Sequence, residues 1–201
     1  MGLWLRADPL VLASKSAARR AVVEAAGIPV EIVPADIDER GIEAASGQAT
    51  PGDVAGLLAR EKARAVSAAM PGRLVVGADQ TLAIGTTRFS KPADRDAARL
   101  QLKMLRGRSH ELYSAAALAA NGKVVFQAIL VATMTMRAFS DEALDRYLDD
   151  VGPAVMSSVG AYQVEGIGIQ LFEKIDGDHF TILGLPLLPL LAALRDAGAL
   201  A

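Results

Sequence analysis

The sequence predicts an α/β fold in which a mixed central sheet is flanked by helices. Short apolar runs alternate with segments of helical periodicity from residue 10 onward, which is the pattern of an α/β domain. Residues 74–78 form a continuous apolar run, as expected for a strand that is covered on both faces. Two later β-rich stretches, 111–118 and 124–137, are joined through Asn121 and Gly122. This dipeptide is typical of a hairpin, so part of the sheet is expected to be antiparallel.

Length and composition favour one globular domain over residues 1–201. The hydrophobic share of 52% and charged share of 22% are those of a folded protein. The chain has no cysteine, which excludes disulfides, thiolate zinc sites and a cysteine nucleophile and fits a reducing compartment. We therefore expect a cytoplasmic protein.

The charge pattern argues against nucleic acid and membrane partners. The formal net charge is −2, so no sequence-wide positive field would attract nucleic acid. Arg6 and Asp8 interrupt the N-terminal segment, which does not resemble an export signal. The longest apolar run, 182–194, is too short for a membrane span and contains two prolines. No membrane segment is expected.

The first third of the chain predicts strand, helix, strand, loop and helix. The corresponding residues are 10–13, 17–26, 30–33, 36–48 and 50 to about 70. The stretch 36–48 is polar with little periodicity, which favours an exposed loop. Thr50, Pro51 and Asp53 are typical of a helix start, because the hydroxyl and the carboxylate can each satisfy a free backbone donor.

The rest of the chain predicts a strand that ends at Asp79, further strands and three more helices. The expected strands are 74–78, 81–84, 111–118, 124–137, 161–164 and 170–175. The expected helices are 94–105, 140–150 with Ser140 as its cap, and one that follows Pro186.

Asp79 is the most informative single residue. It directly follows the buried apolar run 74–78 and is therefore expected at a strand exit, where ligands of open α/β sheets gather. The alternative is an ordinary turn or cap aspartate. Composition does not decide between the two.

A second candidate lies where the first expected strand meets the first expected helix. Ser14, Ser16, Arg19 and Arg20 occupy this junction, and the free N–H groups of a helix start favour an anion. The Arg19 guanidinium adds paired donors for phosphate oxygens. Helix capping by either serine is the alternative interpretation.

Other charged residues are candidates only in combination. Asp38, Glu39, Lys62 and Lys91 would each, in isolation, be solvated surface charges. The only two histidines, at positions 110 and 179, do not suggest a metal site. Glycine-rich phosphate loops of the Walker and dinucleotide types are absent.

Several short sequence stretches, taken in order, resemble the Maf family of nucleoside triphosphate pyrophosphatases over roughly residues 10 to 195. The stretches that carry the resemblance are LASKSAARR (12–20), DE (38–39), AREKA (59–63), GADQ (77–80), KP (91–92), GRSH (107–110), GAY (160–162) and GLPL (184–187). None is diagnostic alone, but together they are in the family's order.

The resemblance implies a fold related to the inosine triphosphate pyrophosphatases, with two lobes sharing a sheet and the nucleotide in a central cleft. It also implies a homodimer. Asp79 would be the catalytic carboxylate, as general base or metal ligand, and Glu39 would help to hold the metal. The remaining implied contacts, all to the substrate, are Ser14, Ser16, Arg19, Lys62 and Lys91.

The implied chemistry is consistent with these residue types. A triphosphate carries about four negative charges, which cationic side chains and a divalent ion must neutralise. Mg²⁺ or Mn²⁺ prefers oxygen ligands and retains waters, so a few carboxylates and the phosphates suffice. Water would then attack at the α,β bridge, with Asp79 orienting or deprotonating it.

Three positions bear on the choice of base. The first motif departs from the family's common Ser-Pro-Arg-Arg form at Ala17 and Ala18. Gln80 and Glu165 are similar to the family branch that prefers 7-methyl-GTP over dTTP and UTP, and a glutamate can accept hydrogen bonds from a guanine edge. We therefore expect Ala18, Gln80 and Glu165 to govern substrate specificity.

Two other functions stay open. One is a nucleotide-binding regulator of septum formation or cell division that does not turn over its ligand, against which the intact Asp79 and Lys91 argue. The other is a house-cleaning pyrophosphatase for inosine or xanthosine triphosphate.

Overall fold

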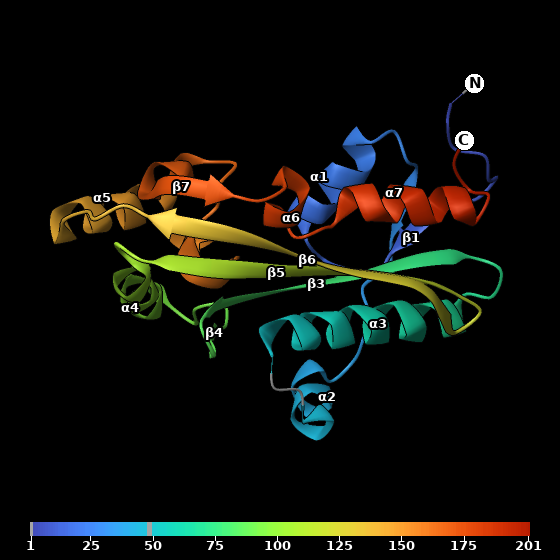
Figure 1. The fold of residues 1–201 in the computed structure, drawn as a ribbon, viewed down its shortest axis with the longest axis horizontal. Helices are drawn as coiled ribbons and strands as arrows, with labels where there is room; N and C mark the ends of the chain where they lie inside the picture. Colours follow the sequence, from blue (N-terminus) through green and yellow to red (C-terminus); the bar gives the residue numbers. More distant parts are fainter. Residues whose placement is uncertain (1, 48–49) are drawn as a thin grey trace. The chain divides into compact units, whose positions relative to one another are not determined.

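The computed structural model describes residues 2–47 and 50–201. Figure 1 shows the order of its elements along the chain. The strands are β1 (Leu10–Leu12), β2 (Val30–Ile32), β3 (Leu74–Ile84), β4 (Thr87–Phe89), β5 (Ser109–Ala120), β6 (Lys123–Met136) and β7 (Phe172–Asp176). The α-helices are α1 (Ala17–Ala25), α2 (Glu39–Ser46), α3 (Pro51–Ala69), α4 (Arg95–Leu105), α5 (Asp141–Val151), α6 (His179–Ile182) and α7 (Leu187–Asp196). The 3₁₀ turns are η1 (Gly152–Met156), η2 (Val159–Ala161) and η3 (Ile167–Leu171).

The sheet is mixed, as the sequence predicts. Its strand order is β2-β1-β3-β5-β6-β7, and β4 pairs with β3 off this path. β1 runs parallel to both β2 and β3. β4 is antiparallel to β3, and β7 is antiparallel to β6. The predicted hairpin is confirmed, because Asn121 and Gly122 both have positive φ between β5 and β6.

The chain divides into two compact units. The first comprises Met1–Gln80, Tyr113–Leu130 and His179–Ala201, and the second comprises Thr81–Leu112 and Val131–Asp178. Strands β3, β5 and β6 each contribute residues to both units. The candidate site described below is built from residues of the first unit.

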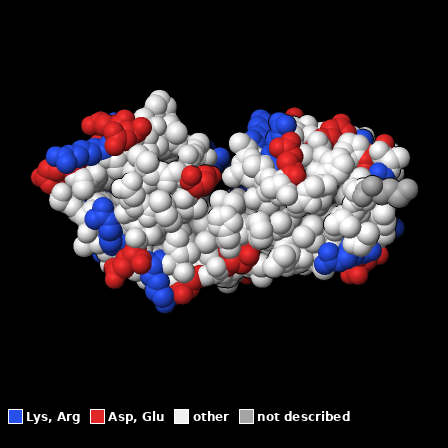
Figure 2. Space-filling view, turned by 90° about the horizontal axis from the view of Figure 1, so that it is seen from above, with Lys and Arg blue, Asp and Glu red and all other residues white. Residues whose placement is uncertain are grey.

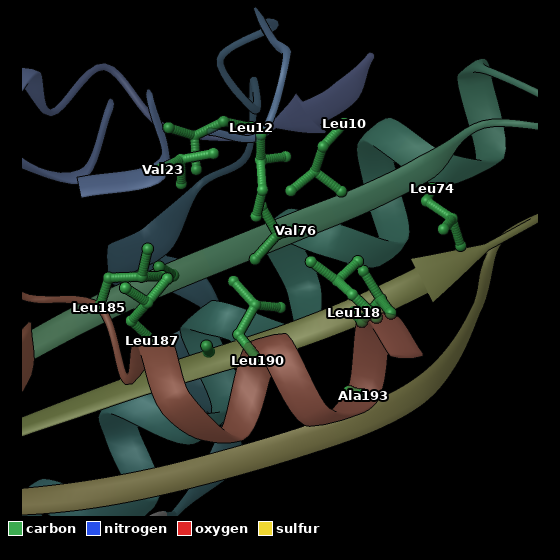
Figure 3. Packing of buried hydrophobic residues seen from close by; sticks show 14 of the residues in the cluster. Leu10, Leu12, Val23, Leu74, Val76, Leu118, Leu185, Leu187, Leu190 and Ala193 are labelled. Atoms are coloured by element: carbon green, nitrogen blue, oxygen red, sulfur yellow. The ribbon is translucent and has the colours of Figure 1, made fainter. Parts of the chain in front are cut away.

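The core of the first unit has two faces. On one face of the sheet, α1 and α7 cover β1, β3 and β5 (Figure 1). Figure 3 shows Leu12, Val76 and Leu190 among the side chains that fill this space. On the other face, alanines of α3 pack against alanines of β5. Small side chains on both surfaces let α3 lie close to the sheet.

The second unit has its own packing. Ion pairs connect α4 to α5, with Arg99 bound to Asp145 and both Lys103 and Arg106 bound to Asp141. His110 is buried on β5, and its Nε2 lies 2.7 Å from the Tyr162 hydroxyl. Phe172 packs edge-on against the Tyr162 ring.

Local signals at helix starts are confirmed where a side chain caps the helix. Thr50 accepts a hydrogen bond from Asp53 N at the start of α3, and Ser140 does the same from Ala143 N at the start of α5. Each bond satisfies one of the backbone donors that a helix start leaves free. These contacts fix where α3 and α5 begin.

The loop expected over 36–48 is wrong for most of that stretch. Residues Glu39–Ser46 form helix α2, which begins where the Asp38 carboxylate accepts a hydrogen bond from Gly41 N. The helix has only eight residues and none of them is buried, so it lacks the long buried apolar face by which a helix is most easily identified in a sequence. Gln48, at the end of the expected loop, is outside the described residues.

Three further expectations are corrected. Asp79 is not at a strand exit, because β3 continues through it to Ile84, where β4 pairs with its second half. Residues 161–164 are not a strand: Gly160 and Ala161 have positive φ within and at the end of the turn η2. The short helix α6 precedes Gly184 where no element was expected.

Charged side chains are interspersed on the surface. Figure 2 shows basic and acidic groups mixed in small clusters on one face, which agrees with the net charge of −2. Within residues 2–47 and 50–201, no helix is both long and apolar enough to cross a membrane.

Candidate active site

The site begins where β1 ends beside β3. The pairing of these parallel strands finishes at Leu12 and Val76, and Ala13 N donates to Val76 O at 2.8 Å. The chain then turns through Ser14 into α1, while β3 continues. The carboxyl end of β1, and not that of β3, therefore provides the open position at which ligands of α/β sheets gather.

Asp79 lies on β3 and points toward α3. Its Oδ1 is 2.7 Å from Lys62 Nζ, and the two side chains are only 12% and 10% exposed. Because successive side chains alternate across a strand, Asp79 shares its face with Gly77. A Cβ on Gly77 would lie 2.2 Å from Ala59 O and 2.5 Å from Ala63 N. The absence of a side chain at Gly77 thus allows α3 to approach and bring Lys62 to Asp79.

Glu39 joins this pair from the start of α2. Its Oε1 lies 3.0 Å from Lys62 Nζ, and its side chain is half exposed. One ammonium group therefore contacts two carboxylates. No group of three or more His, Asp or Glu side chains able to hold a metal occurs in the described part of the chain. Glu39 and Asp79 are the two carboxylates that meet at this place, and both contact Lys62.

The environment of Asp79 changes its acidity. Burial raises the pKa of the Asp79 carboxyl above its usual value, while the charges of Lys62 and Arg19 act in the opposite direction. The negative charge of Glu39 contributes to the increase. A carboxylate with a raised pKa, closer to neutral pH, is better suited to proton transfer than an ordinary surface aspartate.

The Arg19 guanidinium is held by main-chain and side-chain oxygens. Its Nε donates to Gly184 O at 2.8 Å, and its Nη1 donates to Ala78 O at 2.8 Å and to Ser14 Oγ at 3.2 Å. Ser16 is the N-cap of α1 and accepts from Arg19 N at 3.4 Å. The capping interpretation of Ser16 is confirmed, and its hydroxyl hydrogen is left available for another acceptor.

Gln80 points to the opposite face of β3 from Asp79. Its Nε2 lies 2.9 Å from Ser114 Oγ, 3.2 Å from Thr181 O and 3.1 Å from Ile182 O. Gln80 therefore contacts the segment that ends at Gly184. The carbonyl of Gly184 in turn accepts the hydrogen bond from Arg19.

The remaining candidates are Ala18, Lys91 and Glu165. Ala18 is half-buried on α1, in the first unit. Lys91 and Glu165 are exposed residues of the second unit. The structure thus brings Ser14, Ser16, Arg19, Glu39, Lys62 and Asp79 together in the first unit, whereas Lys91 and Glu165 belong to the second.

Three structural roles escape analysis of the sequence. Gly77 permits the approach of α3, Gly184 supplies a carbonyl to Arg19, and Ser114 binds Gln80. The two glycines are inside motif stretches, which is the only sequence signal that marks them. Nothing in the sequence singles out Ser114, because a serine within a β-rich stretch has no distinctive pattern.

The arrangement defines a site for an anion next to a buried carboxylate. A pre-positioned guanidinium and two serine hydroxyls at a helix N-terminus suit phosphate oxygens. The ammonium-bound Asp79 beside them is suited to act on a proton or a metal ion.

Comparison with known proteins identifies the family. The family model for Maf-like proteins matches residues 9–197. The chain therefore belongs to this family. A nucleoside triphosphate pyrophosphatase of Rhodopseudomonas palustris strain ATCC BAA-98 / CGA009 is 58% identical over 201 residues, which is 100% of both chains. A 7-methyl-GTP pyrophosphatase of Mesorhizobium japonicum is 52% identical over 195 residues, covering 96% of this chain and 98% of the relative.

A more distant likeness occurs among solved structures. A HAM1 protein from Coxiella burnetii is similar over 63% of this chain and 72% of its own, with a TM-score of 0.44 and 18% sequence identity.

Proposed function

We propose that this chain hydrolyses the α,β-phosphoanhydride bond of a nucleoside triphosphate and releases the monophosphate and pyrophosphate. The observation that carries the proposal is the state of Asp79: Lys62 holds Oδ1, whereas Oδ2 has no hydrogen-bond partner among the described residues. Full-length relatives that carry the name of this activity support it.

In this proposal Asp79 acts on the attacking water. Its Oδ2 accepts a proton while the water oxygen forms a bond to the α-phosphorus. The bond from that phosphorus to the bridging oxygen breaks, and pyrophosphate leaves with the bonding electrons. The raised pKa of Asp79 increases its basicity, while the bond to Lys62 keeps its position fixed.

Cationic side chains neutralise the substrate. Arg19 and Lys62 are already held in place beside Asp79, and fixed charges of this kind stabilise the charge that develops in phosphoryl transfer. Ser14 and Ser16 offer hydroxyls to the same phosphates. Lys91 is a further triphosphate contact that the family resemblance implies, and we keep it in the proposal on that ground.

A divalent cation, Mg²⁺ or Mn²⁺, fits the donors present. Glu39 and Asp79 offer hard carboxylate oxygens that both already contact one cation, the Lys62 ammonium. Mg²⁺ is commonly held by one or two carboxylates, with waters and substrate phosphates in the remaining positions. When bound, the ion would supply Lewis acid stabilisation of phosphate charge. Treatment with EDTA should abolish turnover, and added Mg²⁺ or Mn²⁺ should restore it.

The substrate we favour is 7-methyl-GTP or a similarly modified nucleotide. The name of the Mesorhizobium japonicum relative supports this choice. Glu165 is exposed and can accept from a guanine edge, and Gln80 has an amide oxygen available for the same purpose. Ala18, at the start of α1, completes the set of specificity positions.

The experiment that tests the function is pyrophosphate release from a panel of canonical and modified triphosphates. Asp79→Asn should reduce turnover by orders of magnitude while the protein stays folded. Asp96→Asn, at an exposed position of α4, is the matched control and should leave turnover unchanged. Near-normal activity of Asp79→Asn would contradict the mechanism.

The same panel separates the alternatives. Absence of pyrophosphate release from every triphosphate, with either metal, would favour a nucleotide-binding regulator of septum formation. Selective release from inosine or xanthosine triphosphate would favour the house-cleaning function. Release mainly from 7-methyl-GTP supports the specificity proposed here.

Assembly and location complete the proposal. We propose a cytoplasmic homodimer, for which the absence of cysteine and the family membership are the support. Analytical ultracentrifugation at micromolar concentration should give twice the mass of 21.0 kDa; a monomer mass would contradict it.

A further inference from the structure

Ser114 is a fully buried hydroxyl on β5 that connects two parts of the first unit. Its Oγ accepts a hydrogen bond from Gln80 Nε2 at 2.9 Å and donates one to Thr181 O at 2.6 Å. A buried hydroxyl that both donates and accepts fixes the direction of each partner, because neither bond can be exchanged for one to water.

The contacts determine the orientation of the Gln80 amide. Thr181 O and Ile182 O are main-chain carbonyls and can only accept, so the amide nitrogen must face them. The amide oxygen of Gln80 consequently points away from these carbonyls. Ser114 reinforces this orientation, since its own hydrogen is already given to Thr181 O.

The same carbonyls belong to the turn that supports Arg19. Gly184 N donates to Thr181 O at 3.0 Å, and Gly184 O accepts from Arg19 Nε at 2.8 Å. Gly184 has φ +89°, and a Cβ there would lie 3.3 Å from Arg19 Nε and 3.6 Å from Gln80 Cδ. Both side chains therefore lie beside this glycine, and hydrogen bonds connect Ser114 to Arg19 through Thr181 O and Gly184.

We infer that Ser114 is a positioning residue, which sets the Gln80 amide and, through the turn that ends at Gly184, the Arg19 guanidinium. This inference rests on the proposed function, in which Arg19 contacts the triphosphate. Loss of the hydroxyl would leave the turn held by fewer bonds, so Arg19 would lose part of its fixed orientation. Phosphate affinity would decrease, because a mobile guanidinium must be ordered when the ligand binds.

The test uses Ser114→Ala and a matched control, Ser67→Ala. Ser67 is also fully buried, and its Oγ accepts from Gly122 N at 3.0 Å in the β5–β6 turn. Inorganic triphosphate is the probe, with affinity measured by calorimetry in the full-length protein. Ser114→Ala should weaken triphosphate binding about tenfold, a loss of about 1.4 kcal/mol, and raise KM similarly. Ser67→Ala should change both less than twofold.

A double-mutant cycle distinguishes positioning from general destabilisation. In an Arg19→Ala background, adding Ser114→Ala should have little further effect on triphosphate affinity, because the group that it positions is gone. Equal losses in both backgrounds would overturn the inference, as would equal effects of Ser114→Ala and Ser67→Ala.

The outcomes also separate this inference from the proposed function. Triphosphate binding that depends on Ser114, without pyrophosphate release by the wild-type protein, would contradict only the function. Normal turnover with unchanged triphosphate affinity in Ser114→Ala would contradict only the positioning role. A wild-type protein that neither binds triphosphate nor releases pyrophosphate would contradict both.

Discussion

Lys62 Nζ lies 2.7 Å from Asp79 Oδ1 between α3 and β3, and both side chains are almost wholly buried. Removal of either partner from a buried ion pair is strongly destabilising, because it leaves the other charge buried without compensation. Because Asp79 is also the proposed base, the pair connects stability to function: Lys62 favours the charged form of Asp79, whereas burial favours the neutral form.

The first prediction concerns this ion pair. Lys62→Met should lower the free energy of unfolding by about 3 kcal/mol, because it leaves a buried carboxylate without its ammonium partner. In an Asp79→Asn background the same change should cost clearly less. Urea denaturation of the two single variants and the double variant measures the difference; strictly additive losses would show that the pair is not coupled.

The second prediction concerns the pH dependence of activity. Burial raises the pKa of Asp79 above the usual value of an aspartate, and the charged form is the proposed base. Activity should therefore fall, as pH decreases, at a higher pH than for an ordinary aspartate. The charge of Glu39 contributes to the raised pKa, so Glu39→Gln should move the acid limb of the kcat/KM profile to lower pH. An unchanged limb would contradict this assignment.

The third prediction concerns the packing of α3. Gly77→Ala should lower the free energy of unfolding by about 1–3 kcal/mol or more and reduce turnover, because the new Cβ would overlap Ala59 O and Ala63 N and displace Lys62. Gly166→Ala is the control, since a Cβ there meets only Gln163 O at 3.9 Å. Thermal melts and pyrophosphate release measure both effects, and equal behaviour of the two variants would refute the explanation.

The fourth prediction concerns His110. Burial lowers the pKa of His110 from 6.5 to about 4, so the unfolded chain binds the proton more readily than the folded one. The neutral imidazole contributes to the free energy of unfolding above pH 6.5. This contribution, about 3 kcal/mol in total, is lost as pH falls toward 4. His110→Gln should lose less stability than wild type between pH 7 and pH 4.

Two measurements check the fourth prediction. Urea denaturation at both pH values gives the stability difference, with His179→Gln as a control that keeps His110 in place. Titration of the His110 ring by NMR gives its pKa directly in the folded protein. A midpoint near 6.5 would contradict the burial argument.

The fifth prediction concerns Lys91. Lys91→Ala should raise KM and lower kcat if this exposed side chain contacts the triphosphate. Lys123→Ala, an exposed lysine at the start of β6, should change neither. Unchanged KM and kcat in Lys91→Ala would show that Lys91 is an ordinary surface charge without a role in substrate binding.

Local sequence determines much of this protein. The caps at Thr50 and Ser140, the Asn121-Gly122 hairpin and the apolar run before Asp79 are each specified by neighbouring residues, so their structures follow from the chain alone. Helix α2 and the second half of β3 do not. Helix α2 is short and none of its residues is buried, and β3 continues past Asp79 where β4 pairs with it.

The sequence by itself gave the mixed α/β class and, through motif order, the residues Arg19, Lys62 and Asp79. Only the tertiary structure decided how they meet: Gly77 lets α3 approach β3, the end of β1 opens the position beside Asp79, and Gly184 O holds Arg19. The physical reason is that caps and turns depend on residues a few positions apart. The charge and acidity of Asp79, in contrast, depend on burial and on partners brought together from distant parts of the chain.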